Sequence, residues 1–115
     1  MVNDIERNKL RLLHILEAID AANDFLVDVS KEEFDNNYEK QSAVIRQFEI
    51  IGEAASHLAP DFKKDHSDID WAKVVGMRHK MIHDYFEVDT DIVWFTVAED
   101  LPGLQQKIKK ILEKM

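Results

Sequence analysis

The sequence predicts an all-α protein, an antiparallel bundle of four main helices with a kinked or fifth helix at the C-terminal end. Three observations favour this fold class. The 115 residues include only three glycines and two prolines, apolar residues recur at helical spacing over long stretches, and no stretch shows the alternating pattern of a strand. With 45% apolar residues, a chain of this length fills one hydrophobic core, so we expect residues 1–115 to form a single domain.

The N-terminal half is expected to contain two main helices. The first extends from Asp4 to about Asp28, with its apolar residues on one face. Ser30 and Glu33 have the spacing of a capping box. The second main helix follows a turn at residues 35–37 and ends near residues 59–60, because a proline disfavours the α conformation in the residue before it.

The C-terminal half is expected to begin with a loop, since residues 61–70 are charged and show no periodicity. Asp70 has the character of an N-cap for a third helix, whose apolar stripe continues through residues 71–85. The acidic and hydroxyl side chains of residues 89–91 are suited to cap a fourth helix. Residues 102–103, Pro-Gly, interrupt that helix, so the last segment is either a short fifth helix or the far side of a kink.

The charge balance limits the partners of the protein. The 15 basic and 23 acidic side chains give a net charge of −8, which opposes non-specific attraction to a polyanion, so any contact with RNA must be local. The chain has no cysteine, which excludes disulfides, thiolate metal sites and a cysteine nucleophile. No apolar run approaches the ~20 residues of a membrane span, and we expect a cytoplasmic protein with no membrane partner.

Arg78 is the main anomaly of the third predicted helix, because it occupies a position on the apolar stripe. An unpaired guanidinium buried in a core would be prohibitively costly. Arg78 must therefore pair with a carboxylate, reach water, or face a crevice that receives an anion. The ordinary alternative is that the side chain of Arg78 extends past the apolar stripe and pairs with an acid at the surface, as in most proteins.

His83 and Tyr85 lie on the same predicted helix as Arg78 but differ in direction. On a straight helix His83 points about 140° away from Arg78, whereas Tyr85 points within about 20° of it. A site that uses both Arg78 and His83 therefore needs a long arginine side chain, a bend near Asp84, or a second subunit. We favour a homodimer that presents both residues at a symmetry axis.

The segment Gly76–Tyr85, GMRHKMIHDY, resembles the R-x4-H-x-Y signature of HepT-like proteins in the HEPN superfamily. Residues 48–55, 69–71 and 88–94 are similar to the segments that flank this signature in the family. The resemblance covers residues from about 42 to 104 in the right order, and four ordered segments are far more specific than one motif.

The resemblance implies a HEPN-type bundle, a homodimer with both motifs in a shared cleft, and an endoribonuclease that needs neither metal nor cofactor. It also implies that the protein is the toxin of a toxin–antitoxin pair, neutralised by a minimal nucleotidyltransferase antitoxin that transfers AMP to the motif tyrosine. Assembly with the antitoxin into a larger hetero-oligomer is compatible with this scheme. By position, Arg78 and His83 would be catalytic and Tyr85 the site of AMPylation. His79 stands where the family often has asparagine, and its imidazole would supply a supporting hydrogen bond.

The chemistry of RNA cleavage suits these residue types. RNA supplies its own nucleophile, the 2′-hydroxyl, and a histidine can exchange protons near neutral pH, which is worth about 10²–10⁴-fold in rate. His83 is the candidate for that role. Arg78 would stabilise the negative charge that develops on the phosphate oxygens. Tyr85 could donate a hydrogen bond to the phosphate, although an aromatic residue on an apolar stripe more often only packs.

Other interpretations remain open for the same residues. His83 could be a surface or capping histidine near a helix end. His79, His83 and Glu87 follow one helical stripe and could hold a divalent metal. As a function, the main alternative is a non-catalytic subunit that binds a nucleotide or positions substrate for a nucleotidyltransferase, and a pure dimerisation scaffold is a third class.

Two groups of charged residues lie outside the motif. Arg46, Glu49 and Glu53 align on one face of the second main helix as a solvated salt-bridge row, and one of the acids could instead hold Arg78 or His83 in position. The only basic cluster is at the C-terminal end and consists of Lys107, Lys109, Lys110 and Lys114. Lysines at the C-terminal end of a helix commonly interact favourably with the helix dipole and increase solubility. The other interpretation is that these lysines bind RNA.

Overall fold

The computed structural model describes residues 3–77, 82–83 and 87–115, and the side chains of residues 82, 83 and 87 lie outside the description. The elements of secondary structure follow in chain order. They are α1 (Asp4–Leu26), α2 (Lys31–Asp35), α3 (Tyr38–Ser56), α4 (Pro60–Asp65), α5 (Trp71–Val75), β1 (Ile82–His83), β2 (Glu87–Val88), α6 (Thr90–Phe95), a π-helical segment (Thr96–Asp100) and α7 (Leu101–Glu113).

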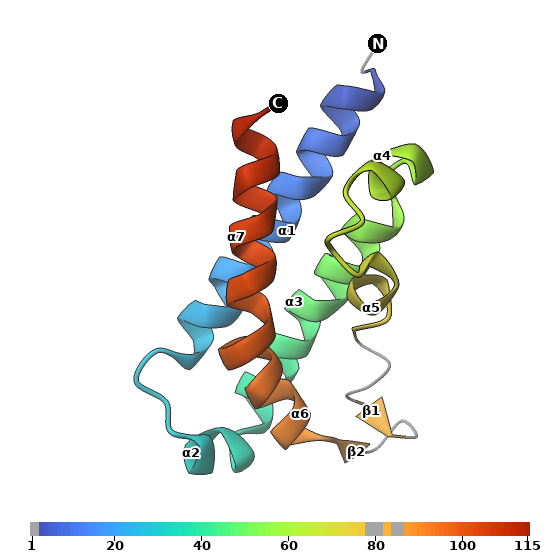
Figure 1. The fold of residues 1–115 in the computed structure, drawn as a ribbon. Coiled ribbons are helices and arrows are strands. Elements are labelled where there is room, and N and C mark those ends of the chain that lie inside the picture. The colour runs from blue at the N-terminus through green and yellow to red at the C-terminus, as the bar shows by residue number, and fades with distance from the viewer. Residues whose placement is uncertain (1–2, 78–81, 84–86) are drawn as a thin grey trace.

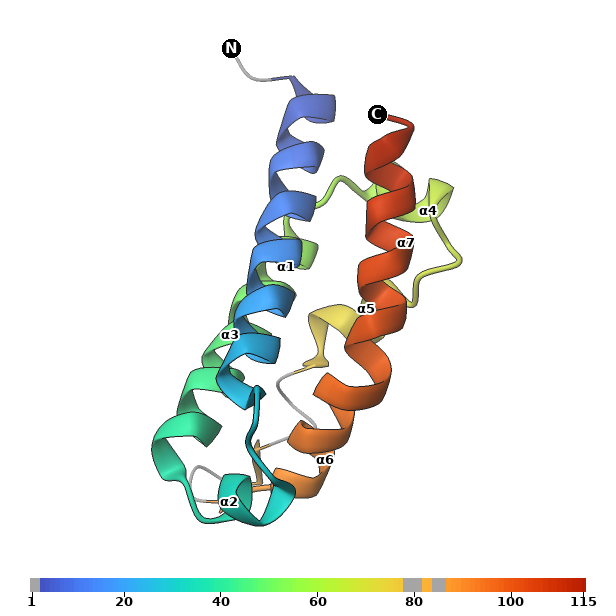
Figure 2. The same ribbon diagram turned by 90° about the vertical axis from the view of Figure 1, so that its left-hand side faces the viewer.

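The predicted all-α bundle is confirmed. The chain descends in α1, returns in α3, descends again through α5 and returns through α6 and α7, so successive main helices are antiparallel (Figures 1 and 2). α1 and α3 pack along their lengths, while the short α5 packs on α3. In the described part of the chain, regular structure other than helix consists of the two-residue strands β1 and β2, which pair at one end of the bundle.

The core comes from the faces that the helical periodicity predicts. The largest fully buried side chains are all apolar: Leu12, Ile15, Ile19, Phe34, Val44, Phe48, Ile51, Val93, Leu101 and Ile108. Asn8 is the one buried amide among the described residues, and its Oδ1 accepts a hydrogen bond of 3.1 Å from the backbone N–H of Ala59. That bond ties α1 to the turn between α3 and α4, so a polar group in the core is satisfied.

The predicted capping residues are confirmed. The Ser30 hydroxyl accepts a hydrogen bond from the backbone N–H of Glu33. The Asp70 carboxylate caps α5, and the Asp89 carboxylate caps α6 by accepting from the backbone N–H of Ile92. Each cap satisfies an N–H that the first helical turn leaves without a partner.

Two predicted boundaries are wrong in the middle of the chain. α3 ends at Ser56 rather than near residues 59–60, and part of the predicted loop 61–70 forms α4 (Pro60–Asp65). Pro60 occupies the first turn of α4, where its missing N–H is not needed and its fixed φ favours helix. A helix of six residues is also too short to show an apolar periodicity.

The third predicted helix ends earlier than the sequence predicts. α5 ends at Val75, and Ile82 and His83 form strand β1 instead of continuing a helix through Tyr85. Gly76 caps the C-terminal end of α5. A glycine inside a helix costs about 1 kcal/mol relative to alanine, which favours ending the helix there.

The C-terminal helix changes its winding instead of breaking. α6, the π-helical segment and α7 follow without interruption from Thr90 to Glu113, so the last segment is not a separate fifth helix. The N–H of Leu101 bonds the carbonyl of Thr96, five residues earlier. Pro102, which has no N–H, follows directly in the first turn of α7, so the change of winding coincides with the predicted interruption.

No helix within the described ranges is both long enough and apolar enough to cross a membrane.

Candidate active-site region

The motif segment joins α5 to α6 at one end of the bundle (Figure 1). Arg78, His79 and Tyr85 lie outside the described residues, and of His83 the structure describes the backbone alone. What the structure defines is therefore the frame that holds this segment. The frame consists of the end of α5, the β1–β2 pair and the start of α6.

The end of α5 is fixed by burial and by a close approach to α3. Trp71, Val74 and Met77 are buried, so the chain is anchored in the core up to the residue before Arg78. Gly52 of α3 lies directly beneath the last turn of α5. A Cβ atom added at Gly52 would stand 2.8 Å from the backbone carbonyl oxygen of Val75.

Gly52→Ala is therefore expected to lower the free energy of unfolding by about 1–3 kcal/mol, the usual cost of overpacking. The clash is with backbone, so relief requires α5 to move, and α5 carries the beginning of the motif. Urea denaturation measures the loss of stability. Gly103→Ala is the matched control, because no atom lies within 4 Å of the added Cβ, and alanine is favoured over glycine in a helix. Equal stability of the two variants would mean that α5 can move away from α3 at little cost in free energy.

The other side of the frame is the β1–β2 pair. The two strands are antiparallel, with Ile82 opposite Val88 and His83 opposite Glu87. This pairing fixes the backbone of His83 next to the start of α6, which Asp89 caps. His83 therefore belongs to a short hairpin and not to the helix that contains Trp71.

Because His83 lies in a strand, the geometry of a single helix does not relate it to Arg78, His79 or Glu87. The angle of about 140° between Arg78 and His83 assumed one straight helix, and that helix ends at Val75. The metal-binding stripe of His79, His83 and Glu87 assumed the same helix, whereas His83 and Glu87 face each other across two strands. The homodimer and the shared cleft consequently lose their support from helix geometry.

The start of α6 is also linked to α2. Lys31 Nζ lies 2.9 Å from Asp35 Oδ2 and also pairs with Asp91 in the first turn of α6. Hydrogen bonds to Asp91 and Asp35 raise the pKa of Lys31, and the hydrogen bonds from Lys31 and then from Thr90 lower the pKa of the Asp35 carboxyl. These groups are exposed to solvent, so they help to orient α6 more than they stabilise it.

In the charged row on α3, Arg46 and Glu53 are exposed and Glu49 is half-buried. Arg46 Nη1 lies 3.4 Å from Glu49 Oε2, and Glu53 lies 3.5 Å from the Nδ1 atom of His57. The predicted salt-bridge row is thus confirmed for Arg46 and Glu49. Whether an acid of α3 contacts Arg78 or His83 lies outside the described residues.

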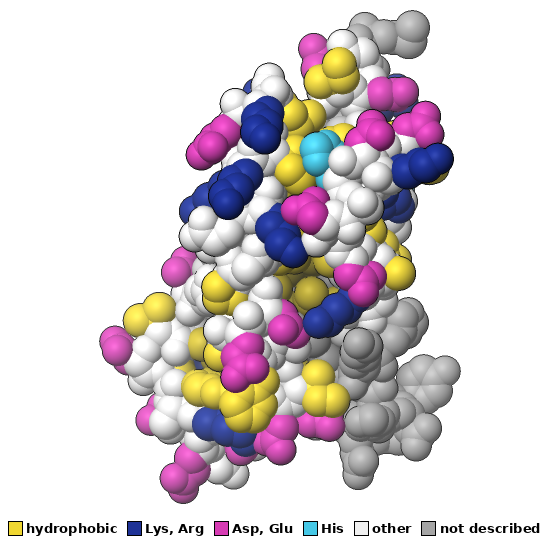
Figure 3. All heavy atoms as spheres, viewed as in Figure 1, with side chains coloured by type: hydrophobic (Ala, Val, Ile, Leu, Met, Phe, Trp, Pro, Cys, Tyr) yellow, Lys and Arg dark blue, Asp and Glu magenta, His cyan; other side chains and the backbone are white. Residues whose placement is uncertain are grey.

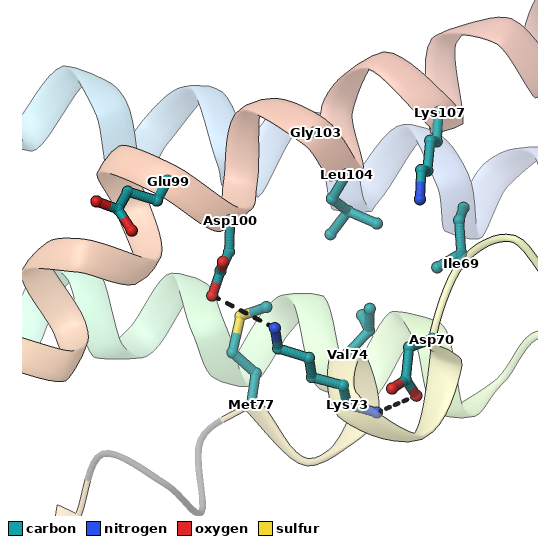
Figure 4. A pocket seen from close by; sticks show the side chains of 10 residues that line it. All are labelled: Ile69, Asp70, Lys73, Val74, Met77, Glu99, Asp100, Gly103, Leu104 and Lys107. Carbon is teal, nitrogen blue, oxygen red and sulfur yellow. Dashed lines mark hydrogen bonds and ion pairs between the residues drawn. The ribbon is translucent and has the colours of Figure 1, made fainter.

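A cavity of about 250 Å³ opens between α5 and the beginning of α7, next to the motif segment (Figure 4). Its inner wall is apolar and includes Val74, Met77 and Leu104. Lys73 Nζ reaches across to Asp100 Oδ2 at 3.6 Å, and both side chains are about half exposed. The cavity thus offers an apolar floor and a charged rim beside the residue that precedes Arg78.

The cavity has no periodic signal in the sequence. Its walls come from α5, the π-helical segment and α7, which are separated in the sequence and meet only through packing. The Pro-Gly pair at residues 102–103 was the one local signal, because a change of helical winding is frequent at functional sites.

Comparison with known proteins places the chain in a family. The family described as ribonuclease HepT-like matches residues 15–111. A protein of Thermococcus cleftensis named Probable ribonuclease HepT is 43% identical over 97 residues, which is 84% of this chain and 88% of that protein. No solved structure shows a significant match. The chain belongs to the HepT-like ribonuclease family.

Two further relatives carry provisional RNase names. One, from Caldanaerobacter subterraneus subsp. tengcongensis, is 37% identical over 103 residues, or 90% of this chain and 92% of the relative. The other, from Methanocaldococcus jannaschii, is 40% identical over 101 residues, or 88% of this chain and 93% of the relative. Both cover nearly the whole bundle, so the similarity is not confined to the motif.

Proposed function

We propose that this protein is a metal-independent endoribonuclease, the toxin of a toxin–antitoxin pair, with Arg78 and His83 as its catalytic residues. The observation that carries the proposal is the R-x4-H-x-Y sequence of residues 78–85 in a chain that belongs to the HepT-like ribonuclease family. The described residues on both sides of the motif segment support it, because Trp71, Val74 and Met77 are buried before the segment and Asp89 caps α6 after it.

The proposed reaction is an intramolecular attack in the RNA. His83 takes the proton of a 2′-hydroxyl, whose oxygen attacks the adjacent phosphorus, and the bond from phosphorus to the 5′-oxygen breaks. The departing 5′-oxygen receives a proton from a general acid, and the products are a 2′,3′-cyclic phosphate and a 5′-hydroxyl. Arg78 binds the phosphate oxygens, where its planar fork meets the developing charge. His79 and Tyr85 supply supporting hydrogen bonds.

The active form is proposed to be a homodimer in which two copies of the motif line one cleft. The family resemblance supports this assembly. A minimal nucleotidyltransferase antitoxin is the proposed partner, and it neutralises the protein by transferring AMP to Tyr85.

Incubation of the purified protein with an end-labelled RNA tests the proposed activity. Because the 2′-hydroxyl is the nucleophile and no activated water is needed, fragments are expected at equal rates with and without excess EDTA. Gel electrophoresis of the fragments over time gives both rates. Cleavage that EDTA abolishes and a divalent ion restores would instead support a metal site.

A further inference from the structure

A second hollow lies between α7 and the connection from α4 to α5. Its volume is about 330 Å³, and it is lined by His66 and Asp68 from the connection between α4 and α5, together with four residues of α7. These four are Lys107, Lys110, Ile111 and Lys114. Three lysines against one aspartate give this hollow a local positive charge in a chain whose net charge is −8.

The lysines converge because of their spacing. Positions 107, 110 and 114 share one face of a helix, and the helical rise of 1.5 Å per residue spreads them over about 10 Å. Lys107 Nζ donates a 2.8 Å hydrogen bond to the backbone carbonyl of Asp68, which holds its ammonium group at the edge of the hollow. Lys109 belongs to the same helix but does not line the hollow. In Figure 3, lysine and arginine side chains gather over the upper part of α7.

The helix dipole does not account for all of this arrangement, although it favours Lys110 in the last turn of α7 and Lys114 at its C-cap. A favourable effect of cations is confined to the last turn of a helix, and α7 ends at Glu113, so Lys107 lies more than one turn from that end. Solubility does not account for it either, since it requires lysines on the surface but no shared hollow.

The lysine hollow and the cavity at the end of α5 share one lining residue. Lys107 lines both spaces, and the cavity reaches Met77, the residue before Arg78. That cavity is also lined by Asp70, Glu99 and Asp100, so contacts with phosphate are assigned to the lysine hollow alone.

We propose that the lysine hollow binds consecutive phosphates of a single-stranded RNA and positions the substrate of the ribonuclease. This inference rests on the proposed function for its biological role, but binding itself does not depend on cleavage. Lysines bind phosphate as point charges. The three lysines span about 10 Å along α7, which is enough to contact neighbouring phosphates of one RNA strand. Lys110 and Lys114 are binding residues in this proposal and take no part in the chemistry.

The test measures binding of a fluorescein-labelled single-stranded RNA with 2′-O-methyl groups, which cannot be cleaved by 2′-hydroxyl attack. The variant is Lys110→Gln with Lys114→Gln. Its matched control is Lys109→Gln with Lys9→Gln, which removes the same charge from exposed helix positions outside the hollow. Glutamine and lysine have similar helix propensities, so both variants should fold.

The Lys110/Lys114 variant is expected to bind at least about tenfold more weakly than the control at low salt. Losing two phosphate contacts should also reduce the salt slope of log K by about 1.4, since each contact on a single strand contributes about 0.7. With a cleavable RNA, KM should rise and kcat should stay close to that of the control. Equal affinities and equal salt slopes for the two variants would overturn the proposal.

The outcomes separate this proposal from the ribonuclease proposal. If wild-type protein cleaves no RNA but binding still depends on Lys110 and Lys114, the lysine hollow stands and the ribonuclease assignment fails. If cleavage is normal and both double variants bind alike, the ribonuclease assignment stands and the lysine hollow fails.

Discussion

Arg78→Ala is expected to lower the rate of RNA cleavage by about 10²–10³-fold while leaving the fold intact. Removing one preorganised donor from a site of developing charge has an effect of this size. A charged residue contributes little to an apolar core, so the loss of Arg78 should change the free energy of unfolding by less than about 1 kcal/mol. Single-turnover cleavage and urea denaturation measure the two quantities on the same preparation.

Arg7→Ala is the control for this variant, since Arg7 is exposed on α1 and far from the motif in sequence. It removes the same charge and should leave cleavage unchanged. A loss of several kcal/mol of stability in Arg78→Ala would indicate a buried, paired guanidinium with a structural role.

His83→Asn separates catalysis from binding at the same site. Asparagine keeps hydrogen-bonding capacity but does not exchange protons near neutral pH, so cleavage should fall by about 10²–10⁴-fold. Affinity for RNA should stay near that of the wild type. A protein that binds RNA equally well with either residue and cleaves with neither would be a binding or substrate-positioning subunit.

A third large effect is expected at Tyr85. Co-expression with the nucleotidyltransferase should abolish cleavage, because AMP adds a negative phosphodiester and a bulky nucleoside where the substrate phosphate is to bind. Intact-mass measurement should show additions in units of AMP, and Tyr85→Phe should show none.

Phenylalanine retains the ring of Tyr85 and removes only the hydroxyl, so Tyr85→Phe is a conservative control for packing. This variant should cleave RNA more slowly than the wild type, because it lacks the supporting hydrogen bond, but at the same rate with and without the antitoxin. Full neutralisation with an unchanged mass would mean that the antitoxin inhibits by binding alone.

Local signals in the sequence predicted the helix starts well. The caps at Ser30, Asp70 and Asp89 depend on one side chain and a backbone N–H three residues later, so they do not need the tertiary structure. The apolar faces of α1 and α3 were predicted for a similar reason, since a fixed period selects the buried residues. Ile5 is the exception, because it follows the period but remains 66% exposed near the beginning of α1.

The segment around the motif was predicted less well. Apolar residues from Trp71 to Tyr85 fit a helical stripe, but the same spacing also fits a short helix followed by a hairpin. The choice depends on a non-local contact, the approach of Gly52 to the Val75 carbonyl, and on the pairing of His83 with Glu87. Neither interaction leaves a periodic signal in the sequence.

The roles of the candidate residues were predicted from the family resemblance. The fold describes only the elements on either side of them. Arg78, His79 and Tyr85 lie outside the described residues, and their roles remain predictions. The lysine cluster is different, because the structure adds to the sequence pattern. It separates Lys107, Lys110 and Lys114, which line one hollow, from Lys109, which does not.

The chemical ends of the cleaved RNA test the central claim most directly. Attack by the 2′-hydroxyl leaves a 2′,3′-cyclic phosphate on one fragment and a 5′-hydroxyl on the other, and mass spectrometry of a short defined RNA cleaved in EDTA identifies both. Our account predicts these ends from wild-type protein. Fragments with a 5′-phosphate, formed only when a divalent ion is present, would contradict it and indicate a metal-activated water as the nucleophile.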